Sequence, residues 1–236
     1  MILEEVFANV SWMLICYAYI LLIIFVSSKM DTSLHVSRRV SRKFLHAMIG
    51  NLLFIIPFFT ANIYPVLVSA SFILVTFLAS PFSPFRNFGR RLKGLADITE
   101  EGHKFGLILY AISYTFLALF FTSKPYIIAA GILPMAYGDA AASIIGERYG
   151  KRKYRFIVEK SLEGSIAMFF ASFLSFTISL AFFSLFYAFS FFNKIFMAVI
   201  VAGVATLVEG LSPKGLDNVT VPFSCAFVFL LLNGSV

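Results

Sequence analysis

The chain has 236 residues, of which 60% are hydrophobic and 13% charged, with 30 phenylalanines and a mean hydropathy of +0.90. No water-soluble domain of this size has enough core to hide so much apolar surface, so this composition excludes the soluble classes and predicts an integral membrane protein. The formal net charge is +7. In a membrane protein the distribution of that charge matters more than its sum, and we expect no nucleic-acid partner.

Eight apolar runs follow one another along the chain, each of a length that favours a helix over a barrel strand. The first carries Glu4 and Glu5 and has no basic leader region, so we expect it to be a retained helix. We predict an all-α polytopic membrane bundle of about eight transmembrane helices, forming a single integral membrane domain over residues 1–236. The predicted runs lie at 6–27, 46–60, 62–80, 105–122, 125–147, 164–190, 194–211 and 220–236.

Basic residues fall on alternate loops between these runs. With the N-terminus outside, the inner loops 28–45, 81–104, 148–163 and 212–219 hold 17 of the 19 lysines and arginines. The positive-inside rule therefore predicts that both termini lie on the outer side and that all large loops are cytoplasmic.

The stretch from Tyr137 to Ser165 joins an apolar run, a basic loop and a second apolar run. Asp139 lies in the first run, where a carboxylate costs several kcal/mol unless it is paired or bound to a cation. Gly146 and Gly150 follow on one helix face, which lets a neighbouring backbone or a phosphate approach closely. A buried acid, a bare helix face and a basic loop predict a site for a metal-bound anion. Alone, Asp139 could also be a pairing partner within the bundle.

Several familiar site motifs are absent from the sequence. It contains no phosphate-binding G-x-x-x-x-G-K-[ST] loop, no G-x-G-x-x-G fingerprint, no H-E-x-x-H zinc pair and no G-x-S-x-G nucleophile elbow. What remains is a set of polar residues that the predicted topology places at the cytoplasmic ends of helices. Acids that can hold Mg²⁺ and bases that can hold phosphates make a phosphoryl-transfer or nucleotidyl-transfer site plausible. Each residue also has a plain structural interpretation, such as an interface anchor for Lys160, a helix N-cap for Ser161 and a packed polar residue for His46.

Three of these segments resemble the motifs of CTP-dependent polyprenol kinases, the group of dolichol kinase, phytol kinase and the related CTP-dependent diacylglycerol kinases. The first is RKFLH, which ends at His46, and the second runs from Gly138 to Ser165. The third is DNVTVP, which begins at Asp217 and follows Glu209. They occur in the family's order over about 180 residues. The family's third motif has an acidic pair before its Asn, whereas this chain has Leu216 and Asp217.

The resemblance implies a lipid kinase that transfers the γ-phosphate of CTP to the hydroxyl of an isoprenoid alcohol of the dolichol, phytol or geranylgeraniol type. The active site would lie on the cytoplasmic face of the plasma membrane or an endomembrane. Asp139, Asp217 and, as a third acid, Glu209 would hold Mg²⁺, and Lys160 would hold a phosphate. His46 or Asp139 would take the hydroxyl proton. The residues expected to bind the nucleotide are Lys43, Gly146, Gly150, Lys151, Arg152, Ser161, Gly164, Ser165 and Asn218.

Two alternatives stay open at this point. One is another CTP-dependent reaction, either a kinase whose acceptor is diacylglycerol or nucleotidyl transfer as in the phosphatidate cytidylyltransferases, although the longer signature of that enzyme is missing here. The other alternative is a small-solute transporter, which would also place a lone acid inside a helix but would need two similar halves. The sequence shows no such symmetry.

Overall fold

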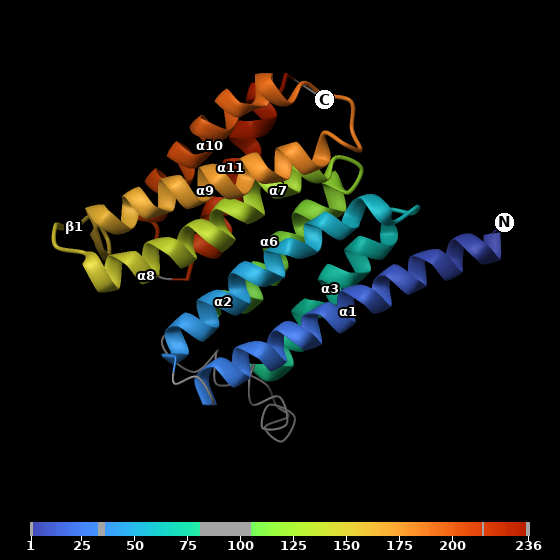
Figure 1. Ribbon diagram of the computed structural model, residues 1–236, viewed down its shortest axis with the longest axis horizontal. Helices are drawn as coiled ribbons and strands as arrows, with labels where there is room; N and C mark the ends of the chain where they lie inside the picture. Colours follow the sequence, from blue (N-terminus) through green and yellow to red (C-terminus); the bar gives the residue numbers. More distant parts are fainter. Residues whose placement is uncertain (1, 33–35, 81–104, 214, 235–236) are drawn as a thin grey trace. The chain divides into compact units, whose positions relative to one another are not determined.

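The structure is a computed structural model that describes residues 2–32, 36–80, 105–213 and 215–234 (Figure 1). The regular elements of the described residues are helices apart from one two-stranded sheet, which confirms the predicted all-α class. It divides into two compact units, Met1–Ser123 and Lys124–Val236, each of which is described by itself.

Apolar helices dominate both units. Among the described residues, four helices are long and apolar enough to cross a membrane: Ile2–Met30, Pro125–Tyr149, Leu162–Phe183 and Phe191–Leu211. Three further apolar helices, Ile63–Leu78, Gly106–Phe121 and Asp217–Leu232, are shorter than the roughly 20 residues that a straight span needs. These helices support an integral membrane protein, and the number of eight spans stays a prediction.

The described residues of the first unit form five helical elements. Within it, α3 packs against α6, and α1 packs against both α2 and α3. Polar side chains hold α1 in place: the Tyr19 hydroxyl donates to the Met48 carbonyl at 3.0 Å, and the Ser27 hydroxyl donates to the Ser41 carbonyl at 2.9 Å. The elements are α1 (Ile2–Thr32), α2 (Arg38–Gly50), the 3-10 helix η1 (Asn51–Phe58), α3 (Ile63–Ala79) and α6 (Gly106–Phe121).

The second predicted apolar run, 46–60, is not one regular helix. The helix α2 ends at Gly50, and the chain continues as the 3-10 helix η1 with Pro57 inside it. Proline lacks the amide hydrogen that an α-helical ladder requires, so η1 cannot continue as a regular α-helix through this position.

The second unit is organised around one buried helical run, α7 (Pro125–Leu133), the π-helical turn η2 (Pro134–Gly138) and α8 (Asp139–Tyr149). All nine residues of α7 are buried, because α9 and α11 pack against it. Pro134 opens the π turn, since it cannot donate the next α-helical hydrogen bond. The turn ends directly before Asp139, and π-helical turns of this kind are frequent at functional sites.

Three further helices complete the second unit: α9 (Leu162–Phe183), α10 (Phe191–Leu211) and α11 (Asp217–Leu232). They pack in chain order, α9 against α10 and α10 against α11. Large apolar side chains remain exposed on their outer faces, including Phe170, Leu174 and Leu207. Such faces are stable in contact with lipid and unfavourable in water.

Candidate functional site

A short hairpin between α8 and α9 places the central lysine of the site. Its strands are β1 (Lys153–Arg155) and β2 (Glu159–Ser161), and Tyr154 is the cross-strand partner of Lys160. The side chains of two directly opposed residues in an antiparallel strand pair project from the same face of the sheet. Tyr154 and Lys160 are therefore both on the half-buried face, while Lys153, Arg155 and Glu159 are exposed and Ser161, at the end of β2, is buried.

The hairpin is fastened to the start of α9 by hydrogen bonds. The hydroxyls of Tyr154 and Ser165 lie 2.6 Å apart, and the Leu162 amide donates to the Arg152 carbonyl at 2.9 Å. The Arg152 amide in turn donates to the carboxylate of Glu163, at 3.2 Å to the nearer oxygen. The sequence interpretation treated this stretch as a basic loop with Lys160 and Ser161 opening the next helix. The structure instead places both residues in β2, with the helix beginning at Leu162.

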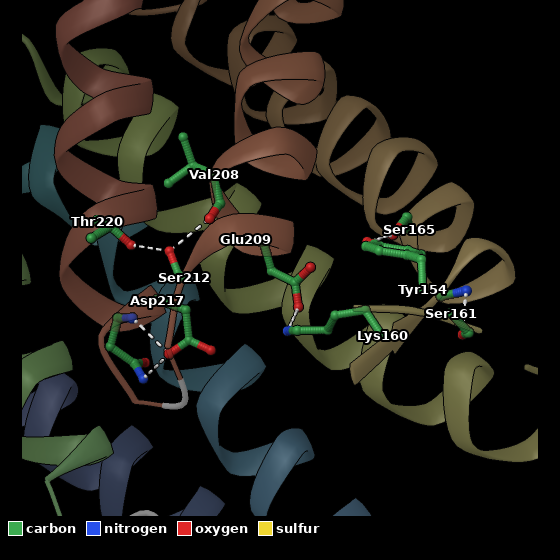
Figure 2. A network of polar contacts seen from close by, with 11 residues as sticks. Tyr154, Lys160, Ser161, Ser165, Val208, Glu209, Ser212, Asp217 and Thr220 are labelled. Carbon is green, nitrogen blue, oxygen red and sulfur yellow. Dashed lines mark hydrogen bonds and ion pairs between the residues drawn. The ribbon is translucent and has the colours of Figure 1, made fainter. Parts of the chain in front are cut away.

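Lys160 forms an ion pair with Glu209 in the last turn of α10 (Figure 2). The Glu209 side chain is 3% exposed, whereas that of Lys160 is 22% exposed. The Glu209 carboxylate is thus buried beside its positive partner, whereas the Lys160 side chain remains partly accessible to solvent or to a ligand. Glu209, one of the three acids expected to hold a metal, thus has its charge neutralised by the Lys160 side chain.

Two further acids act on the same lysine. Burial lowers the pKa of Lys160, but the charges of Glu209, Asp139 and Asp217 outweigh this effect and leave the pKa raised above its usual value of 10.5. Asp139 and Asp217 are themselves buried, at 8% and 9% exposed. Lys160 is therefore protonated at neutral pH, and it is the positive centre of a set of three buried carboxylates.

The turn between α10 and α11 holds Asp217 in place. Its carboxylate accepts hydrogen bonds from the backbone and side-chain amides of Asn218, at 2.9 and 3.0 Å. Gly215 adopts a φ of +89°, a conformation that favours glycine, and its carbonyl accepts from the Asn218 side chain at 3.3 Å. The Ser212 and Thr220 hydroxyls, 2.6 Å apart, join the two helix ends (Figure 2).

The glycines of α8 and α9 bring the two helix backbones together. A Cβ on Gly164 would lie 2.9 Å from the Ala142 carbonyl oxygen and 3.2 Å from the Gly146 Cα. A Cβ on Gly150 would lie 2.6 Å from the hydroxyl oxygen of Ser161, which accepts the Gly164 amide as the N-cap of α9. The sequence predicted that either a neighbouring backbone or a phosphate approaches the glycine face of α8, and in the structure the backbone of α9 approaches it.

The acids fit Mg²⁺ only as part of a larger coordination shell. Among the described residues, no group of three His, Cys, Asp or Glu side chains lies close enough to hold a metal ion. Protein-bound Mg²⁺, however, usually takes one or two carboxylates and completes its shell with water and substrate phosphates. Asp139 and Asp217, both buried oxygen donors, suit that arrangement.

The remaining predicted residues fall into two places. Lys151 and Arg152 are exposed just before the hairpin. His46 and Lys43 belong to α2 in the first unit, where His46 is 6% exposed and stacks on Tyr110 with ring centroids 4.3 Å apart. The acids and bases of the predicted loop 81–104 lie outside the described residues.

The sequence interpretation did not identify Tyr154. A weak signal was present, because tyrosine is a residue type that favours strands. The apolar residues that follow it, Phe156, Ile157 and Val158, form the bend between the two strands and give no sign of where the strands lie. Ser212 and Thr220 carried no comparable signal, since single hydroxyl residues are common near helix ends.

Comparison with known proteins confirms the resemblance to polyprenol kinases. The chain is 34% identical over 146 residues to a phytol kinase of Synechocystis and 30% identical over 148 residues to phytol kinase 1 of Arabidopsis thaliana. It is 33% identical over 148 residues to the dolichol kinase of Saccharomyces cerevisiae. These matches cover 58%, 59% and 58% of this chain.

The same matches cover only part of each relative: 59% of the Synechocystis protein, 49% of the Arabidopsis protein and 27% of the yeast protein. The chain thus spans about half the length of the phytol kinases that it matches, and less of the dolichol kinase. No family model matches the chain, and no solved structure matches it.

Proposed function

We propose that the protein is an integral membrane kinase that transfers the γ-phosphoryl group of CTP to the hydroxyl of an isoprenoid alcohol. The likeness to phytol and dolichol kinases supports the acceptor class. The observation that carries the proposal is the protonated Lys160, whose pKa is raised by the buried carboxylates Glu209, Asp139 and Asp217. Phosphoryl transfer needs such a set of charges, because its catalysis rests on positioning and on electrostatic stabilisation.

In the proposed reaction the lipid oxygen forms a bond to the γ-phosphorus, and the bond from that phosphorus to the β–γ bridging oxygen breaks. CDP leaves, and the hydroxyl proton passes to a base. Lys160 binds an oxygen of the transferring phosphoryl group, and Glu209 holds the lysine in position for it. Mg²⁺, held by Asp139 and Asp217, would neutralise charge on the phosphates when bound.

Two residues are candidates for the base. Asp139 belongs to the same unit as Lys160 and acts on it electrostatically. His46 belongs to the first unit, where it stacks on Tyr110.

The proposal includes a topology of eight membrane-spanning helices with both termini outside and the site in the cytoplasm. It rests on the 17 of 19 basic residues that fall on alternate loops. Single cysteines introduced at Arg155 and at Lys124 test it directly. An impermeant thiol reagent added to intact cells should label position 124 and spare position 155, and the reverse pattern would refute the topology.

The activity is tested with purified protein, labelled CTP or ATP, and a panel of lipid alcohols that includes phytol, geranylgeraniol, a dolichol and diacylglycerol. The proposal expects CDP and a lipid monophosphate, formed from CTP and from a prenyl alcohol. Release of pyrophosphate with a CMP-bearing lipid would show nucleotidyl transfer instead. A diacylglycerol product alone would overturn the acceptor.

A further inference from the structure

An apolar cavity lies within the first unit, between α1, η1, α3 and α6. Its wall is built almost entirely from hydrocarbon side chains and aromatic rings. The residues that matter for the argument are Cys16, Leu52, Phe72, Leu107, Tyr110 and Tyr114. None of the residues assigned above to phosphate or metal lines this cavity.

One polar group in the wall is not explained by the packing. Tyr114 is 6% exposed, and within the described part of the chain its buried hydroxyl has no hydrogen-bond partner. Its ring packs edge-on against Tyr110, with centroids 6.3 Å apart. A buried hydroxyl left without a partner costs about 1–3 kcal/mol, so its presence at a cavity wall indicates a ligand that accepts from it.

The surroundings limit the ligand to one that arrives through the bilayer. The outer faces of the same helices expose large apolar side chains, such as Leu67 on α3 and Phe116 and Leu119 on α6. Tyr114 lies eight residues after Gly106 at the start of α6, which is about 12 Å along the helix. A water-soluble ligand would have no favourable route to this depth, whereas a lipid chain would.

We propose that this cavity holds the isoprenoid chain of the lipid alcohol, with the Tyr114 hydroxyl directed at a carbon–carbon double bond. The identity of the chain rests on the proposed function. An alkene offers a weak π acceptor to a buried hydroxyl, which a saturated acyl chain does not. His46, one of the two candidate bases, stacks on Tyr110 in the wall of this cavity, which connects the chain site with a predicted site residue.

The test uses the full-length protein in nanodiscs and a geranylgeraniol analogue that carries a photoreactive diazirine in its chain, with no nucleotide present. Mass spectrometry of the cross-linked peptides should place the label on residues of α1, η1, α3 or α6 that line the cavity. Unlabelled geranylgeraniol should compete about two- to fivefold better than its fully saturated counterpart. Label confined to other helices, or equal competition by the two alcohols, would overturn the proposal.

Two substitutions in neighbouring positions of α6 provide a matched pair. Ala111→Phe adds bulk inside the cavity, while Ile112→Phe adds bulk on the exposed face, where Ile112 is 41% exposed. The first should reduce labelling about tenfold and the second should leave it unchanged. Tyr114→Phe keeps the ring and should abolish the preference for the unsaturated competitor. Equal labelling of both phenylalanine variants would overturn the proposal, and the competition on the unchanged protein decides it if Ala111→Phe does not fold.

Because labelling requires no phosphate transfer, this result is independent of the kinase assay. A labelled cavity in a protein that phosphorylates no alcohol would refute the proposed function and leave the chain site standing. Phosphorylation of prenyl alcohols without label in the cavity would support the proposed function and refute the chain site.

Discussion

Tyr154 and Lys160 are cross-strand partners in the hairpin, and both side chains reach the last turn of α10. Tyr154 bonds to Ser165 on α9, and a Cβ on Gly210 of α10 would lie 3.1 Å from the Tyr154 hydroxyl. Lys160 pairs with Glu209, the neighbour of Gly210. Tyr154 therefore holds the hairpin against α9 and α10, and the hairpin holds Lys160 beside Glu209.

Replacing Tyr154 by phenylalanine removes the hydroxyl bond and keeps the ring. The lost hydrogen bond is worth about 1 kcal/mol, so kcat should fall about fivefold if the lysine is less well held in the transition state. Tyr149→Phe is the control, since Tyr149 is exposed at the end of α8. Steady-state kinetics with CTP and a prenyl alcohol should separate the two variants, and equal rates would show that the hairpin does not position Lys160.

The ion pair predicts an asymmetric response to mutation. Lys160→Met leaves the nearly fully buried Glu209 without its partner and should destabilise the protein by about 3–5 kcal/mol. Glu209→Gln should cost less, because Lys160 is part-exposed and keeps Asp139 and Asp217 as attracting charges. Unfolding in detergent should show the double variant to be more stable than Lys160→Met alone, and simple additivity of the two costs would contradict the pairing.

The raised pKa of Lys160 sets the sign of its pH dependence. A group whose pKa is higher in the folded state contributes stability below its unfolded pKa, and this contribution is lost as the pH rises through the folded value. For Lys160 that window lies above 10.5. The stability difference between the unchanged protein and Lys160→Met should therefore be constant from neutral pH to about pH 10 and shrink only beyond it. Glu209→Gln should move this alkaline loss of stability to lower pH. The measurement is the unfolding midpoint of each protein across the alkaline range. A loss that begins near neutral pH in the unchanged protein would contradict the raised pKa of Lys160.

The sequence was sufficient to predict the helical membrane class and the place of most helices. The predicted run 194–211, for example, lies within α10, Phe191–Leu211, because no proline and no charged residue falls between Lys194 and Glu209. The hairpin was missed because three-residue strands are stabilised by what they contact, here Ser165 and Glu209, and not by their own length. Long-range partners of this kind leave no local pattern.

The candidate site was predictable as a list of residues and not as a geometry. Glu209 and Asp217 were both expected to hold a metal, but the structure pairs Glu209 with Lys160 and bonds Asp217 to Asn218. Spacing along the chain could not separate these two roles, since both acids flank the same turn. The glycine face of α8 shows the same limit, because the sequence left open whether a backbone or a phosphate approached it.

Two glycine substitutions should change stability in opposite directions. Gly164→Ala places a methyl group 2.9 Å from the Ala142 carbonyl, so α8 and α9 must separate, at a cost of about 1–3 kcal/mol. Gly203→Ala, inside α10, meets nothing within 4 Å and should stabilise the helix by about 0.5–1 kcal/mol. Thermal unfolding in detergent measures both, and an unchanged midpoint for Gly164→Ala would mean that the two helices do not need their close approach.

The last prediction concerns the carboxylate that follows the π-helical turn. Asp139→Asn keeps the size of the side chain and removes its charge, so the protein should fold normally and lose turnover about a hundredfold or more if Asp139 holds the metal. Glu147→Gln is the matched control, an exposed acid on the same helix that should retain full activity.

The measurement is kcat as a function of Mg²⁺ concentration for the three proteins. A metal ligand predicts that excess Mg²⁺ restores part of the lost rate, because a weakened site fills at higher concentration. A base predicts a loss that Mg²⁺ does not relieve. Near-normal turnover of Asp139→Asn would leave Asp139 as a pairing partner in the bundle, and the metal would then have to be assigned without it.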